Sequence, residues 1–81
     1  MKTQEKWSIV AASRRISEVV EVMSTKMENI SATKRLAKNL NGMAKDLMDE
    51  AVVKLEVAIQ DLESVKTQLD LMADLDENQM D

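Results

Sequence analysis

The chain lacks the residues that brace or interrupt most small domains. Its 81 residues include no cysteine, histidine, proline, tyrosine or phenylalanine, and only one glycine and one tryptophan. Without cysteine and histidine, disulfides, zinc-finger sites and histidine-based catalytic pairs are excluded. Because proline is absent and Gly42 is the only glycine, the breakers of a mixed fold are missing too, and the chain is predicted to be all-α. A core of this size without aromatics buries little area per residue, so association with other chains is the expected brace.

The residue types that are present do not form the pattern of a catalytic or a metal-binding site. The candidate nucleophiles Ser, Thr and Lys lie scattered on polar helix faces, with no histidine to activate them. The carboxylates Asp46, Asp49 and Glu50 lack the loop of alternating oxygen ligands with a central glycine that calcium sites use. The sequence therefore predicts a non-enzymatic protein with no cofactor and no metal.

Targeting and membrane-spanning segments are absent from the pattern. Residues 1–7 are too polar for the apolar core of a signal peptide, and no stretch reaches the ~20 apolar residues of a membrane span. A cytoplasmic location is the expectation that follows.

A ladder of heptads, with alternating steps of three and four residues, runs from Ile9 to Met72. A repeat of 3.5 residues keeps one seam of a helix against a partner helix over many turns, so this seam is the predicted helix–helix interface. Its polar positions are Ser13, Lys34 and Asn41, of which the last two are expected to fix the register. The predicted interface residues are Ile9, Ile16, Val20, Met23, Met27, Ile30, Ala37, Asn41, Ala44, Met48, Ala51, Leu55, Ala58, Leu62, Val65, Leu69 and Met72.

The two halves of the chain carry opposite net charge. Residues 1–40 hold eight basic and four acidic residues, net +4, whereas residues 41–81 hold three basic and eleven acidic residues, net −8. Parallel helices would place acid beside acid in the second half, so antiparallel packing is favoured. Exposed pairs are each worth only about 0–1 kcal/mol, so charge selects the orientation and does not hold the structure together.

Two architectures bury this seam: an antiparallel helical hairpin and a single long helix, either of them assembled into an oligomeric bundle or coiled coil. For the hairpin, the segment Asn39-Leu40-Asn41-Gly42 offers residues suited to the left-handed conformation that ends helices, and the seam pairs across a centre near Gly42. For the long helix, helical spacing and heptad phase continue unbroken through this segment, at Leu36, Leu40, Met43 and Leu47.

Those four residues also form a second apolar stripe outside the seam, predicted as a second-face contact. In a two-stranded coil they would face water, so each helix is expected to touch more than one neighbour, in a bundle of three or four helices. The predicted organisation is a flexible N-terminus at 1–6, a helical domain at 7–75 with a turn at 39–42, and an acidic flexible C-terminus at 76–81.

The run from Met27 to Thr33, followed by the KNLNGMAKDL segment at residues 38–47, resembles the central helices of ESCRT-III (charged multivesicular body) subunits. There a Lys-Asn pair, an apolar residue, a small residue and then Lys-x-apolar occur at similar spacing within a Met-rich amphipathic helix, and the basic-then-acidic charge order is similar. The match covers roughly 20 residues. The resemblance implies polymerisation through long helices and contact with acidic membranes.

The function predicted from the residues is helix-mediated assembly: a scaffold, adaptor or structural subunit that pairs with itself or with another coiled-coil protein. Two alternatives stay open, an ESCRT-III-like polymer-forming, membrane-remodelling subunit and a small helical-hairpin RNA-binding regulator. Nucleic acid would need a sustained basic surface, whereas the one basic patch, at Lys34, Arg35, Lys38 and Lys45, is short and offset by acids. Beyond the resemblance, nothing in the sequence indicates a membrane.

Overall fold

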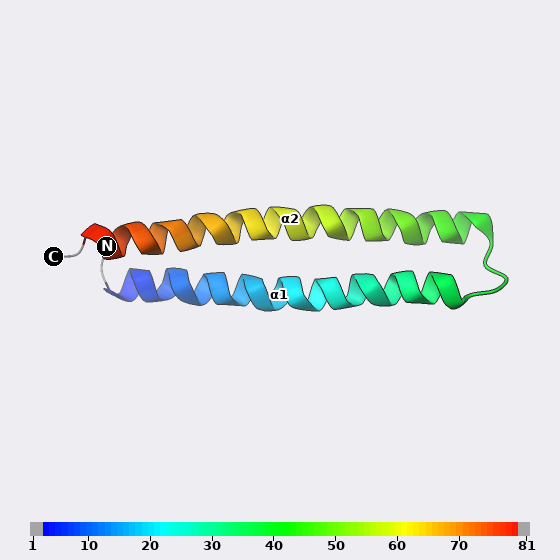
Figure 1. Ribbon diagram of the computed structural model, residues 1–81, viewed down its shortest axis with the longest axis horizontal. Coiled ribbons are helices and arrows are strands. Elements are labelled where there is room, and N and C mark those ends of the chain that lie inside the picture. The colour runs from blue at the N-terminus through cyan, green and yellow to red at the C-terminus, as the bar shows by residue number, and fades with distance from the viewer. Residues whose placement is uncertain (1–2, 80–81) are drawn as a thin grey trace.

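The structure, a computed structural model, consists of two long helices joined by a short turn. Helix α1 is Thr3–Leu36 and helix α2 is Gly42–Gln79. The backbone is described for residues 3–79 and the side chains for residues 3–75. The helices lie side by side and antiparallel, in a rod 64 Å long (Figure 1). This confirms the predicted all-α fold in its hairpin form and excludes the single continuous helix.

The helices extend further than the heptad pattern predicted. Helix α1 begins at Thr3, within the expected flexible N-terminus, and α2 continues to Gln79, within the expected flexible C-terminus. Glu5 and Lys6 are good helix formers near the start of α1, and Glu5 lies in the first turn, where its charge complements the helix dipole. The expected ends thus become helical at 3–6 and 76–79, and residues 1, 2, 80 and 81 lie outside the described residues.

The turn at residues 37–41 is closed by a polar cap. Asn41 precedes α2, and its side-chain Oδ1 accepts a hydrogen bond from the backbone N–H of Ala44 at 3.0 Å. This is the geometry of an N-cap, which satisfies a donor that the first turn of a helix otherwise leaves unpaired. No residue from 3 to 79 has a positive φ. The prediction that Asn and Gly end α1 in the left-handed conformation is therefore wrong; here they start α2.

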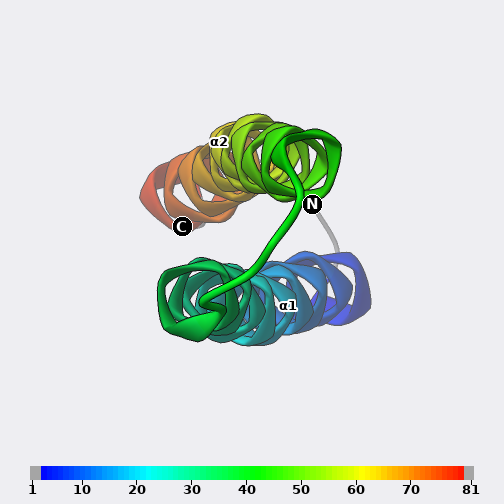
Figure 2. The ribbon, with the colours of Figure 1, turned by 90° about the vertical axis from the view of Figure 1, so that its right-hand side faces the viewer.

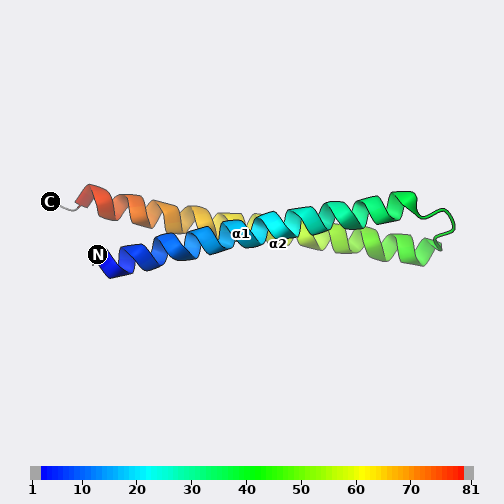
Figure 3. The same cartoon turned by 90° about the horizontal axis from the view of Figure 1, so that it is seen from below.

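Three columns of side chains, each repeating every seven residues, fill the interface between the helices. In α2 the column of Leu55 and Leu62 is central, with the alanines of Ala51 and Ala58 on one side and Val52 and Ile59 on the other. Among the side chains of residues 3–75, Ile59 and Ala73 are the buried hydrophobic ones, and none is fully enclosed. The two helix axes are inclined to each other and cross, as the views from the turn (Figure 2) and from below (Figure 3) show.

Gly42 offers a test of this turn geometry. Its φ is not positive, and a Cβ built on it meets no atom within 4 Å. Gly42→Ala should therefore raise the free energy of unfolding by about 0.4–1 kcal/mol, because the unfolded chain loses freedom that the folded chain does not need. Chemical denaturation followed by circular dichroism measures the change. A loss of stability would mean that residue 42 needs the conformational freedom of glycine.

Candidate helix-docking surface

Two polar pairs between the helices fix the hairpin register. Near the turn, Lys34 Nζ lies 2.6 Å from Asp49 Oδ1. Near the open end, the buried Ser13 hydroxyl donates a 2.5 Å hydrogen bond to Asp70 Oδ1. The two pairs share one midpoint in the chain, between residues 41 and 42, which is within one residue of the centre that the seam predicted. Sliding one helix by a turn would break both pairs at once.

Asp70 holds the open end of the hairpin together through both of its oxygens. Lys66 Nζ donates a 2.7 Å hydrogen bond to Oδ2 from one turn back on α2, while Ser13 reaches Oδ1 from α1. The hydrogen bond from Lys66, followed by that from Ser13, lowers the pKa of Asp70 below its ordinary 3.8, against a smaller opposing effect of burial. Bonds to the charged form are the cause, so Asp70 is a charged structural anchor.

One side of the hairpin gathers charged and hydroxyl side chains. Two shallow grooves open on it, and their walls combine serine and charged side chains from both helices with apolar ones, among them Val20, Met48 and Val53. We call this side the polar flank and define it by Ser17, Glu21, Ser31, Arg35, Asp49, Glu63, Lys66 and Thr67. Water satisfies these polar groups, although Val53 is also exposed on this flank.

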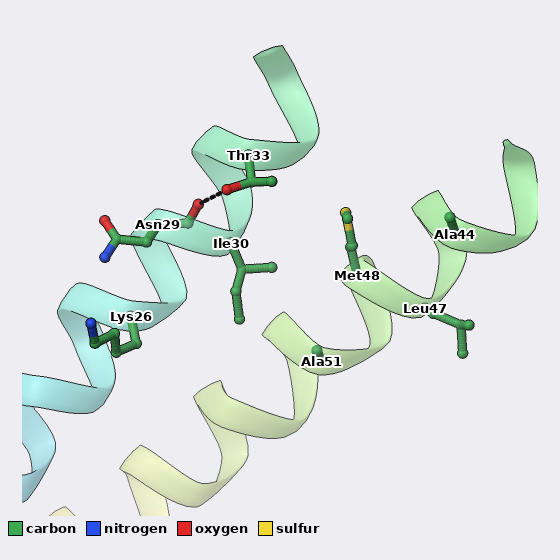
Figure 4. Close-up of a pocket in the computed structure, with 8 residues that line it drawn as sticks. All are labelled: Lys26, Asn29, Ile30, Thr33, Ala44, Leu47, Met48 and Ala51. Carbon is green, nitrogen blue, oxygen red and sulfur yellow. Dashed lines mark hydrogen bonds between the residues drawn. The ribbon is translucent and has the colours of Figure 1, made fainter. Parts of the chain in front are cut away.

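The opposite side carries an apolar groove of about 680 Å³ near the turn (Figure 4). Ile30, Met48 and Ala51 line it where the two helices face each other, and Leu47 points outward from α2. The groove exists because α2 presents alanine at 44 and 51, where a larger side chain would fill the space beside α1. The eight lining residues are Lys26, Asn29, Ile30, Thr33, Ala44, Leu47, Met48 and Ala51.

The apolar surface continues from this groove towards the open end. Val65 and Met72 extend the heptad column of Ala44, Ala51 and Ala58, and both are 48% exposed. On α1, Val19 extends the column of Lys26 and Thr33, and it too is exposed. We call this side the apolar flank and define it by Val19, Ala44, Leu47, Ala51, Ala58, Val65 and Met72. Here small alanines join the larger side chains, and contiguous apolar surface marks an interaction site more often than isolated apolar side chains do.

Most predicted interface residues lie, half-buried, between α1 and α2. These are Ile9, Ile16, Val20, Met23, Met27, Ile30, Ala44, Met48, Ala51, Leu55, Ala58, Leu62 and Leu69, and Ala37 is half-buried at the start of the turn. The structure places three others elsewhere: Val65 and Met72 on the exposed apolar flank, and Asn41 at the cap of α2. Of the second stripe, Leu40 is half-buried in the turn, whereas Leu36, Met43 and Leu47 are exposed. Contact of these residues with another chain stays a prediction.

The sequence pattern missed the third column of the interface. Val52, Ile59, Lys66 and Ala73 each stand four residues after a central seam position, and the structure turns them towards α1. They pack where α1 has small half-buried serines at 17, 24 and 31. The repeat of serine at seven-residue spacing, beside a seam of larger apolar residues, was the available signal, because globular helices bury a stripe wider than two columns.

Comparison with known proteins finds no family model, no curated protein and no solved structure that matches this chain. The resemblance to ESCRT-III helices therefore stays a prediction. Between residues 3 and 79, neither helix has a stretch long and apolar enough to cross a bilayer. In the same part of the chain, no three His, Cys, Asp or Glu side chains converge as metal ligands.

The Asp70 anchor predicts how stability depends on acidity. Because the pKa of Asp70 is lower in the folded chain than in the unfolded chain, its contribution is complete above the ordinary value of 3.8 and is lost as pH falls through the lowered folded value. Between pH 6 and pH 2, Asp70→Asn should thus lose less stability than the wild type does. Urea denaturation at each pH measures this.

Ser13→Ala is the companion variant, since it removes one of the two donors to Asp70 and should show an intermediate acid dependence. Ser17→Ala, which changes a half-buried serine one turn further along α1, is the control. Equal acid dependence in the wild type and Asp70→Asn would mean that Asp70 does not anchor the hairpin.

Proposed function

We propose that this chain is a non-enzymatic, helix-mediated assembly protein: a scaffold, adaptor or structural subunit whose hairpin packs against other helices, copies of itself first, in a helical bundle or coiled coil. The apolar flank carries the proposal. It leaves Leu47, Val65 and Met72 about half-exposed, so covering each would add about half of the 1.5–3 kcal/mol that complete burial of such a side chain is worth. A neighbouring helix would cover all of them in one step.

The accessible surface of the hairpin supports the same conclusion. It measures 6394 Å² for a chain of 9.1 kDa. A compact monomer of this mass is expected to expose about 4,900 Å². The surplus, about 1,500 Å² per chain, exceeds the roughly 800 Å² that each partner buries in a stable interface of standard size. Association is thus the route by which so short a chain gains the burial that its own two helices do not supply.

The chemistry of the groove fits docking better than catalysis. Its polar side chains are Lys26, Asn29 and Thr33, and the Thr33 hydroxyl donates to the backbone oxygen of Asn29 at 2.8 Å. The remaining lining is aliphatic or thioether. Alanine walls with a flexible Met48 suit an inserted apolar side chain, because small residues permit close approach and methionine adapts its shape.

The basic patch that suggested an RNA partner is reduced by the fold. Lys34 points to Asp49 across the helix interface, where the two form an ion pair. Arg35, Lys38 and Lys45 are exposed around the turn. An RNA-binding hairpin would still show salt-dependent retention of RNA, and an ESCRT-III-like subunit would sediment with acidic liposomes; the proposed assembly protein should do neither.

A pair of valine substitutions tests the proposal. Val65 is 48% exposed on the apolar flank, and Val57 is 52% exposed about 80° further around α2, turned away from α1. Val65→Glu should weaken self-association at least about tenfold, because it places an unpaired carboxylate in the contact. Val57→Glu, its matched control, should keep the mass of the wild type. Sedimentation velocity measures both.

Circular dichroism of both variants separates dissociation from unfolding. Helix content should be the same in Val65→Glu and Val57→Glu at a concentration where the wild type is assembled. The proposal fails if the wild-type chain sediments as a folded monomer of 9.1 kDa at high concentration. Equal loss of mass in both variants would mean that the contact does not lie on the apolar flank.

A further inference from the structure

We propose that the apolar flank binds a second copy of this chain in a two-fold dimer whose two turns lie at the same end. This inference rests on the proposed self-assembly and adds the orientation of the partner. A closed pair of identical chains uses the same patch on both copies, and the apolar flank is a patch of that kind. The polar flank, with its serines and carboxylates, then stays in water on the outside.

Two arrangements place this flank against itself. When the two-fold axis runs along the hairpin, the turns share one end, and α1 of each copy lies beside α2 of the other. When the axis runs across the hairpin, the turns lie at opposite ends, α1 meets α1 and α2 meets α2. The two arrangements cover the same apolar side chains, so charge and shape decide between them.

The charge of the two helices favours the axis along the hairpin. Helix α1 carries six basic and four acidic residues, net +2, while α2 carries three basic and ten acidic residues, net −7. The crosswise arrangement packs two helices of net −7 against each other, about 8–10 Å apart, which is close to the screening length of about 8 Å at physiological salt, so their repulsion is only partly screened. The lengthwise arrangement separates them to the diagonal and gives each α2 only α1 neighbours.

Individual charges on the apolar flank agree with this choice. Lys26 stands on the α1 wall of the groove, and Asp61 lies on the same side of α2, two heptads after Leu47. In the register set by Ser13 with Asp70, the two heights differ by about one helical turn. In the lengthwise dimer, Lys26 of one copy therefore meets Asp61 of the other.

The lengthwise arrangement also places a side chain of the second copy, Leu47, beside the groove. A rotation about the long axis keeps every residue at its height and exchanges α1 with α2. Leu47 is 59% exposed and points outward from α2 (Figure 4). In the register of the hairpin it lies at the height of Leu36, so in the other copy it faces α1 between Thr33 and Leu36, at the turn end of the groove. Each copy thus inserts its leucine beside the groove of the other, and the alanines at 44 and 51 leave the room for it.

The absence of cysteine makes a direct distance measurement possible. Asn39→Cys, in the exposed turn, takes a single nitroxide label per chain. Pulsed electron spin resonance on the labelled dimer should give a distance below about 30 Å, because neighbouring helices in a bundle lie only about 10 Å apart. With the turns at opposite ends, the distance would be about 50 Å or more, the length of the 34-residue α1.

A second label at the open end checks the result independently. Ser8→Cys, exposed on α1, should also give a short distance between copies, whereas a dimer mixed from the two labelled variants should give a long one. Circular dichroism and sedimentation of each labelled variant confirm that it is helical and contains two copies.

The outcomes separate the two proposals. Two copies with short distances at both sites support the lengthwise dimer. Two copies with a long turn-to-turn distance overturn it and leave self-assembly standing. A folded monomer overturns self-assembly itself, and a mass of three or more copies overturns the closed pair.

Discussion

The number of apolar columns that one helix can cover on another is the constraint on which this structure depends. Two packed helices bury about three columns each, and here these are the central seam with its two neighbouring columns. The chain carries more apolar surface than that. Part of the excess lies on the side where Leu47, Val65 and Met72 protrude, and the exposed apolar surface leaves the hairpin with a larger area than its mass requires.

Polar residues determine which side is left uncovered. Ser13 with Asp70, and Lys34 with Asp49, lock the register at the two ends of the hairpin. Small serines on α1 then face Val52 and Ile59, and the charges beside them form the polar flank. The alanines of α2 fall on the other side, where their small volume opens the groove. This single register thus produces the polar flank and the apolar flank. Because the two sides differ, a specific partner can distinguish them.

Heptad spacing and charge order were enough to predict all-α structure and antiparallel packing, because both depend on average properties of long segments. The same reasoning could not choose between a hairpin turn and a continuous helix, because the helical spacing continues through the turn at Leu36, Leu40, Met43 and Leu47. A local interaction decides it, the hydrogen bond from Ala44 to the Asn41 side chain. Asn41 was predicted to fix register within the seam, a natural reading of a polar residue in a heptad, yet it acts outside the helix.

The candidate surface was harder to predict than the fold. Val65 and Met72 continue the seam in sequence, but they lie at its edge, because the interface centres on Leu55 and Leu62 and extends to Ile59. A two-column heptad does not show which of its columns is central. That depends on how far each helix rotates to pair Ser13 with Asp70, which is a property of the packed hairpin.

The dependence of thermal stability on protein concentration tests the central claim most directly, namely that the hairpin's uncovered side is buried by another hairpin. When folding is coupled to association, mass action raises the melting temperature as the chain becomes more concentrated. Unfolding followed by circular dichroism across a hundredfold range of concentration should therefore show a steady rise. A melting temperature that stays constant over that range would contradict the account, because it would show that the hairpin does not associate before it unfolds.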